Sequence, residues 1–122
     1  MTQRPNETAE WLAARADSWV DTYKKSMLTP LVLQIVRSHQ PASVPTIRAG
    51  IERGAGWRIT ERGLYRTLQR LENSGFLIST QVEAHRTGAS RKTFTVTDTG
   101  KRFLSEISGR LITLTETGPS RR

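Results

Sequence analysis

Arginine is the residue of this sequence best suited to chemistry with an anionic partner, and four arginines recur at every fourth position. They are Arg58, Arg62, Arg66 and Arg70. Like charges at this spacing disfavour a helix by about 0.2–0.5 kcal/mol per pair, whereas phosphate groups would turn the repulsion into attraction. A guanidinium group also pairs with the edge of guanine. The spacing therefore favours a surface that binds nucleic acid over the alternative, a plain solvated helix face.

An apolar stripe accompanies these arginines and defines the helix that carries them. Leu68 and Leu71 lie within about 40° of Leu64 when each residue advances by about 100°. We predict this helix over residues 60–74, with Thr60 as its N-cap. The residues expected to contact DNA lie away from the leucines: Arg62, Gly63, Tyr65, Arg66, Gln69, Arg70 and Asn73, with Arg58 just before the helix.

Two of these residues lie at the margin of the polar face. Gly63 has no side chain, so the backbone there could approach DNA closely. Tyr65 could pack its ring inward and offer its hydroxyl to a phosphate, but support of the core alone is an equal alternative.

A second basic cluster lies in a predicted β-hairpin at residues 76–97. Residues 76–83 read as one strand, and the run from Thr93 to Thr97 alternates polar and apolar residues, as a second strand does. The basic residues at or beside the hairpin tip are His85, Arg86, Arg91 and Lys92. Such a tip could reach a minor groove or flanking phosphates; the alternative is that hairpin tips are simply polar. Arg48 and Arg53 are weaker phosphate candidates.

The elements that must position these residues are five predicted helices and the hairpin. The second helix is separated from the first by Ser26 as an N-cap, with Pro30 near its first turn. The predicted fold is mainly α with a small β-hairpin (α+β), a winged helix-turn-helix with an extra helix at each end. One domain is expected over 7–116, between disordered tails at 1–6 and 117–122. The helices are predicted at 7–25, 26–40, 43–53, 60–74 and 98–116.

Composition limits the classes of function. The chain has 122 residues, a net charge of +8 and no cysteine, and its pI is about 11.0. A basic domain of this size attracts polyanions. No apolar run is long enough to span a membrane and the N-terminus is not a signal peptide, so we expect a cytoplasmic, nucleoid-associated protein without membrane partners. His39 and His85 are the only histidines. No acid–base pair or metal-ligand spacing stands out, so we expect no enzyme activity, metal or cofactor.

Two segments resemble the PadR family of bacterial regulators. Residues 63–78 are similar to the family's recognition helix and wing entry, in which a Leu-Tyr pair is followed by a Leu, an Arg-Leu-Glu and a Gly. Residues 91–100 resemble its second wing strand, which ends in a Thr, two residues and a Gly. The resemblance covers roughly residues 27–107, and other winged-helix groups share parts of these motifs.

The resemblance implies a homodimer that binds a pseudo-palindromic operator, usually as a repressor released by a small molecule. It assigns DNA contacts to Tyr65 and Arg66 in the recognition helix and to Arg91 and Lys92 in the wing. The chain departs from the family where Val44 and Pro45 replace a Gly and an aromatic residue. Its C-terminal part is one helix, which is typical of the smaller members.

The terminal helices, 7–25 and 98–116, carry more apolar surface than a three-helix core can cover. We therefore predict that they form a two-fold dimer, the alternative being that they close the protomer's own core. Some small PadR-type proteins bind flat aromatic compounds between dimer tryptophans, so an aromatic effector is a further hypothesis, less favoured than packing. The predicted interface residues are Trp11, Trp19, Tyr23, Leu104, Ile107, Leu111 and Leu114.

Three other functions compete with the transcriptional regulator. A plasmid partition or replication protein would bind repeated DNA sites, and a ribosome-associated winged helix would prefer structured RNA. A module that binds only protein is disfavoured by the arginine face.

Overall fold

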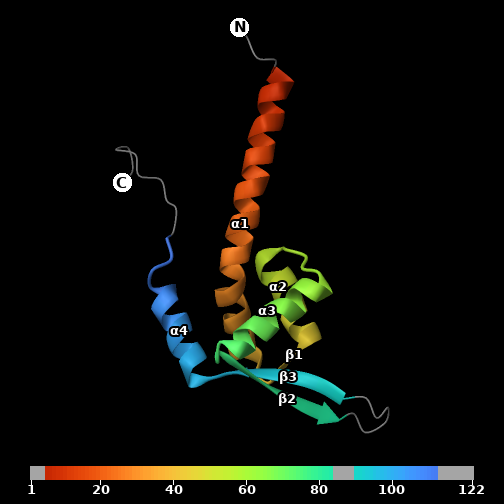
Figure 1. The fold of residues 1–122 in the computed structure, drawn as a ribbon, viewed down its shortest axis with the longest axis vertical. Coiled ribbons are helices and arrows are strands. Elements are labelled where there is room, and N and C mark those ends of the chain that lie inside the picture. Colours follow the sequence, from red (N-terminus) through yellow and green to blue (C-terminus); the bar gives the residue numbers. More distant parts are fainter. Residues whose placement is uncertain (1–4, 84–89, 113–122) are drawn as a thin grey trace.

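The computed structural model describes residues 5–83 and 90–112, and Figure 1 shows a small helical body with a long helix rising from it. The predicted hairpin tip at 84–89, with His85 and Arg86, lies outside the described residues, as does Leu114. The elements in chain order are α1 (Pro5–His39), β1 (Ala42–Ser43), α2 (Val44–Ala55), α3 (Glu61–Asn73), β2 (Leu77–Glu83), β3 (Ser90–Val96) and α4 (Asp98–Ser108).

The two N-terminal helices predicted from the sequence are one continuous helix, so the predicted break at Ser26 is wrong. Ser26 does not cap a helix; its hydroxyl donates a hydrogen bond of 3.0 Å to the carbonyl of Thr22 in the preceding turn. Pro30 lies inside α1 and removes one backbone donor. The helix continues past Pro30 because Val32 and Val36, in the turns that follow, are fully buried in the core. Packing of these turns outweighs the cost of the proline.

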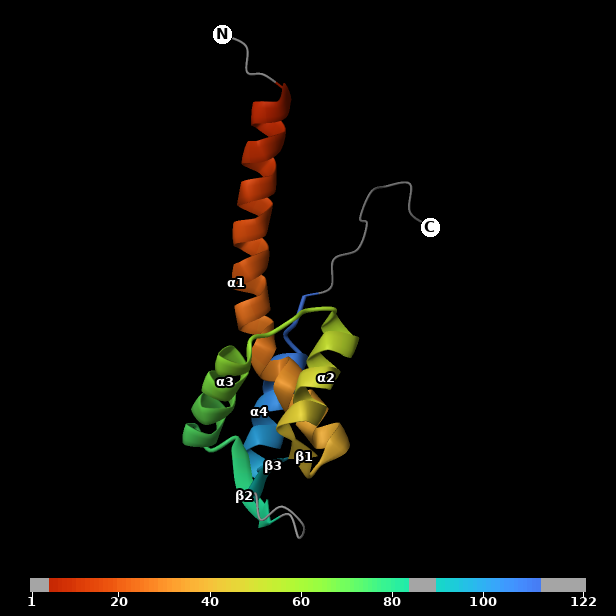
Figure 2. The ribbon, with the colours of Figure 1, turned by 90° about the vertical axis from the view of Figure 1, so that its right-hand side faces the viewer.

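The core surrounds the C-terminal half of α1, and the N-terminal half stands free of the body (Figure 2). The predicted inward stripe of α3 is confirmed, because Leu64, Leu68 and Leu71 are at most 2% exposed. The other buried apolar residues come from all parts of the body: Leu33, Ile35, Ala42, Ile47, Ile51, Leu77, Phe94, Val96 and Leu104.

The predicted hairpin forms an antiparallel sheet with a third strand that the sequence did not predict. The strand order is β1-β3-β2, and β1 pairs Ala42 with Phe94 and Ser43 with Thr93. A strand of two residues shows no alternation that could be recognised. It fixes the start of α2 against the hairpin, because Ser43 is also the N-cap of α2 and accepts a hydrogen bond from the backbone N–H of Thr46.

The last helix is shorter than the predicted 98–116. It begins at Asp98, the predicted start, with Thr97 as its N-cap, but ends at Ser108 before the C-cap Gly109. Leu111 therefore lies beyond the helix and is 50% exposed, although its spacing continues the apolar stripe. Leu111 is not part of the hydrophobic core that the structure shows, so its apolar spacing is not matched by burial.

Gly100 determines how closely α4 packs against the start of the wing, and Gly100→Ala is expected to lower the free energy of unfolding. A Cβ at this position would collide with the carbonyl oxygen of Phe76 and lie 2.8 Å from Val96 Cγ1. The expected loss is about 1–3 kcal/mol, typical of overpacking. Urea denaturation would measure it. Gly109→Ala is the matched control, because its Cβ would meet nothing within 4 Å; equal losses in both variants would contradict this account.

Candidate nucleic-acid interface

The exposed face of α3 carries the polar side chains that the sequence predicted for DNA contact. Thr60 caps the helix by accepting a hydrogen bond of 3.0 Å from the backbone N–H of Gly63. Thr67, in the next turn, is buried and donates to the carbonyl of Gly63 at 3.0 Å. Both hydrogen bonds are local to α3, and the helix is held against the core by the buried leucines of its inner side. The predicted contact residues that are exposed along it are Arg62, Tyr65, Arg66, Gln69, Arg70 and Asn73.

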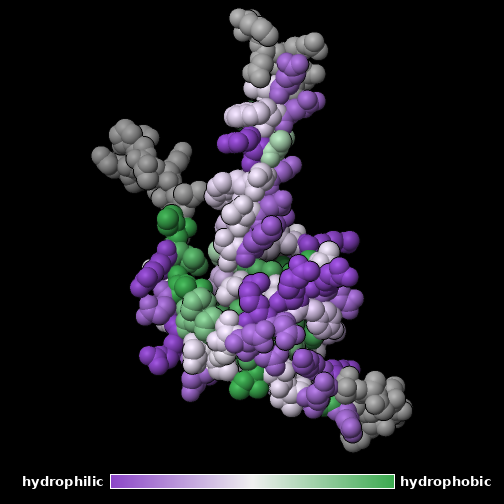
Figure 3. Space-filling model, in the orientation of Figure 1, coloured by the Kyte–Doolittle hydropathy of each residue, from purple (hydrophilic) through white to green (hydrophobic). Residues whose placement is uncertain are grey.

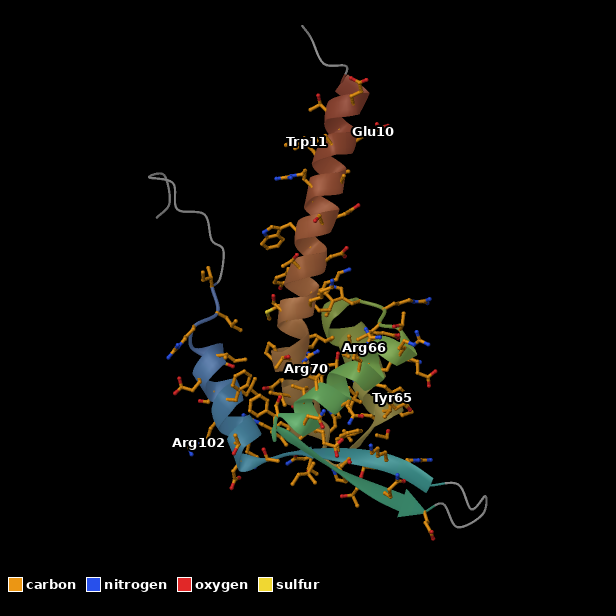
Figure 4. The ribbon with its side chains drawn as sticks, viewed as in Figure 1. Glu10, Trp11, Tyr65, Arg66, Arg70 and Arg102 are labelled. Atoms are coloured by element: carbon orange, nitrogen blue, oxygen red, sulfur yellow. The ribbon has the colours of Figure 1, made fainter. Side chains whose placement is uncertain are left out.

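Arg70 differs from the other arginines of α3. Its Nη2 donates a hydrogen bond of 3.5 Å to Thr29 Oγ1 on α1. In Figure 4 it lies at the α1 end of the helix, whereas Tyr65 lies toward the wing. Arg62 and Arg66 belong to the same half of α3 as Tyr65, so the structure divides the predicted arginine row into two groups.

Arg58 lies in the connection between α2 and α3, beside an aromatic cluster. It is exposed and follows Trp57, whose ring meets Tyr23 edge-on at 6.0 Å. The Lys24 ammonium lies 5.7 Å from the centre of the Trp57 ring. These contacts tie the connection to α1 and hold Arg58 close to the start of α3.

A shallow groove joins α2, α3 and the wing, and it brings Tyr65 together with two predicted wing contacts. The residues that line it are Ser43, Val44, Pro45, Tyr65, Arg91 and Lys92. An adjoining groove shares Val44, Pro45 and Tyr65 and continues to Arg48 on α2. The residues predicted for the site did not include the first turn of α2, which lines this groove. Ser43 marks the start of α2 as its N-cap, and the start of this helix lies beside the first turns of α3 in a helix-turn-helix. The position of Ser43 could therefore have indicated that the first turn of α2 belongs to the site.

Arg91 and Lys92 leave β3 on opposite faces, because successive residues of a strand alternate. Lys92 faces α3: its Nζ lies 3.9 Å from Glu72 Oε1 and 5.9 Å from the centre of the Phe94 ring. Arg91 pairs across the sheet with Val82, and both are exposed. Lys92 is thus turned toward α3 and Glu72, whereas Arg91 lies on the opposite face of the sheet.

The free half of α1 carries the aromatic residues predicted for a dimer interface. Trp11, Trp19 and Tyr23 are 57%, 66% and 44% exposed. The Trp19 and Tyr23 rings stack at 5.7 Å, with their planes 12° apart. Trp11 points to the side of α1 on which α4 lies, and Glu10 points away from it (Figure 4).

The α4 side of the molecule is also apolar, as the green surface along this helix shows (Figure 3). Phe76 and Phe103 stack at 4.4 Å and line a shallow groove there. Ile107 is half-buried and Leu111 exposed. Leu104 is 3% exposed and lies in the protomer's own core.

No group of three or more histidine, aspartate and glutamate side chains among residues 5–83 and 90–112 is arranged to hold a metal ion. In the same part of the chain no helix is apolar over a sufficient length to cross a bilayer.

Comparison with known proteins connects this arrangement to a family. The sequence model of the PadR-like transcriptional regulators matches residues 32–106, which run from the buried half of α1 to α4. The chain belongs to this family. Among curated proteins, none matches the sequence. The family match favours a transcriptional regulator over the partition and RNA-binding alternatives.

Solved structures of PadR proteins share the fold. A PadR family transcriptional regulator from Eggerthella lenta is 27% identical, with a TM-score of 0.72 over 83% of this chain and 86% of its own. Bacillus subtilis PadR, solved in complex with operator DNA, is 25% identical, with a TM-score of 0.62 over 77% of this chain and 54% of its own. The PadR winged helix-turn-helix predicted from the sequence is thereby confirmed. The free half of α1 lies outside the segment that the family model matches.

Proposed function

We propose that this PadR-like regulator is a homodimeric repressor that binds a specific sequence of double-stranded DNA in the cytoplasm, at the nucleoid. In this proposal α3 enters the major groove and the wing contacts flanking DNA. The protein acts by binding and not by catalysis. The likeness to Bacillus subtilis PadR, which was solved with its operator, supports the proposal.

The observation that carries it is the exposed Arg62–Arg66 half of α3 beside the groove that leads to the wing. Arginine side chains on such a helix discriminate guanine by about 1–3 kcal/mol per base pair. Tyr65 and Arg91 border the same groove and are placed to contact phosphates, which position the helix. Arg58 extends this surface beyond the N-terminus of α3, and Gln69 and Asn73 extend it along the helix.

The proposed dimer pairs the free half of α1 with the apolar side of α4 from a second copy. Large exposed apolar patches on a small protein indicate an interface. Trp11, Trp19 and Tyr23 supply one side, and Ile107 and Leu111 supply the other. A two-fold dimer places two α3 helices roughly 34–36 Å apart, one turn of the duplex.

Packing between protomers is the preferred role for the tryptophans, and a flat aromatic effector is the less favoured one. Titration with planar aromatic compounds, followed by tryptophan fluorescence, separates them. Quenching that saturates and weakens DNA binding would support an effector. Unchanged emission would leave packing as the role of Trp11 and Trp19.

Anisotropy measurements with DNA from upstream of the protein's own gene test the proposed function. The matched control is a shuffled duplex of the same length and composition, and both are measured at low and near-physiological salt. We expect a preference for the natural sequence that survives the higher salt, because base contacts depend less on salt than phosphate contacts do. Equal binding of both duplexes that collapses with salt would contradict a sequence-specific regulator.

A further inference from the structure

Glu72 connects three elements through one carboxylate. It lies in the last turns of α3, and its Oε2 accepts a hydrogen bond from Ser79 Oγ on β2 at 2.5 Å. Its Oε1 lies 3.9 Å from Lys92 Nζ on β3. The carboxylate therefore links the arginine-bearing helix to both strands of the wing.

The sheet register explains why these partners meet. Ser79 pairs with Phe94, and Lys92 pairs with Gln81 two residues further along both strands. The period of two places Ser79 and Lys92 on the face that α3 covers. Phe94, on the same face, is buried beneath them.

Other hydrogen bonds between α3 and the wing lie at the base of the hairpin. Phe76 N–H donates to the Leu71 carbonyl at 3.0 Å, and Thr97 Oγ1 donates to the Gly75 carbonyl at 2.6 Å. From Thr80 to Glu83 the strand β2 is exposed. Within the part of the chain that the structure describes, Glu72 thus provides the outermost hydrogen-bonded link from α3 to the wing.

We propose that Glu72 is a positioning residue for DNA binding: it sets the direction of the wing relative to α3 and holds the Lys92 ammonium away from phosphate. Arg91, on the opposite face of β3, is then the β3 cation free to contact DNA. This inference rests on the proposed function. It separates two roles of one carboxylate, a hydrogen-bond acceptor for Ser79 and a counter-charge for Lys92.

Four variants separate these roles by two readouts, the ratio of specific to non-specific affinity and the slope of log K against log salt. Glu72→Gln keeps an acceptor for Ser79 but releases Lys92, so the ratio should stay near the wild-type value while the slope steepens by about 0.9, the value for one added phosphate contact. Ser79→Ala should lower the ratio roughly tenfold, as expected for a lost hydrogen bond to a charged group, and leave the slope unchanged.

The lysine variants provide the decisive comparison. Lys92→Ala in the wild-type background should not change the slope, because Glu72 already holds the ammonium. In the Glu72→Gln background the same replacement should return the steeper slope to the wild-type value. A wild-type slope that becomes shallower by about 0.9 in Lys92→Ala would place Lys92 on phosphate and overturn the proposal.

Failure of the proposed function would be recognised separately. A wild-type protein with no preference for any natural duplex would contradict sequence-specific regulation, whereas the salt slopes on non-specific DNA would still test the Glu72–Lys92 pair. Circular dichroism of each variant shows whether the fold is kept. A folded Ser79→Ala protein with wild-type preference would overturn the role of Glu72 in directing the wing.

Discussion

Replacing Arg62 and Arg66 together by alanine is expected to abolish the preference for the operator while much of the non-specific affinity remains. Both side chains are exposed on the half of α3 nearest the groove with Tyr65. Each arginine–guanine pair contributes about 1–3 kcal/mol of discrimination, so the double variant should lose at least about 30-fold in the ratio of specific to non-specific affinity. Fluorescence anisotropy with the natural and shuffled duplexes measures this ratio.

Arg110→Ala is the control for the loss of an exposed arginine away from α3. Its side chain is 80% exposed beyond the end of α4 and pairs with Glu106, four residues earlier, at 3.2 Å. An exposed pair of this kind contributes little to stability. The control should therefore keep the preference for the operator. If the double variant instead lost affinity equally for both duplexes, the α3 arginines would serve only to bind phosphate.

Trp19→Glu is expected to convert the dimer into a monomer without unfolding it. The Trp19 side chain is 66% exposed in the protomer, so its replacement removes little from the protomer's core. Tryptophans at the centre of an interface often contribute at least about 2 kcal/mol, and a buried carboxylate adds a penalty. The dimer dissociation constant should rise about 30-fold or more. Sedimentation equilibrium measures it, and DNA binding should fall in parallel.

Glu10→Gln provides the comparison on the same helix. Glu10 points away from the side on which Trp11 and α4 lie (Figure 4), so its loss should leave the dimer intact. A Trp19→Glu protein that remains dimeric would exclude this face as the interface. A wild-type protein that is monomeric at micromolar concentration would exclude the dimer itself.

The sequence predicted best where local signals and burial agree. The leucine stripe of α3, its cap Thr60 and the start of the last helix at residue 98 coincide with helices in the structure. The predicted break at Ser26 was wrong because the residue types at Ser26 and Pro30 reflect only local preferences. They contain no information on the core contacts that stabilise the turns of α1 after Pro30. The predicted length of α4 was wrong because the apolar spacing continues to Leu111, which lies beyond the end of the helix and is exposed.

The same distinction applies to the candidate site. The residue types of the DNA-facing surface could be predicted, because the arginines follow the helical period. The directions of individual side chains could not, because they depend on partners distant in the sequence. Arg70 finds Thr29 on α1, 41 residues earlier, and Lys92 finds Glu72 on α3.

The alternation of Arg91 and Lys92 limits which insertions and deletions the wing can accept. A single residue removed from β3 between this pair and the buried Phe94, at Thr93, would exchange their faces, because the side-chain period of a strand is two. Arg91 would then face Glu72, and the shorter, more flexible lysine would take the outward place. Among relatives that keep this pairing, insertions and deletions within β2 or β3 should therefore have an even number of residues. Evolution of the wing is then limited by the length of such changes as well as by the residue types.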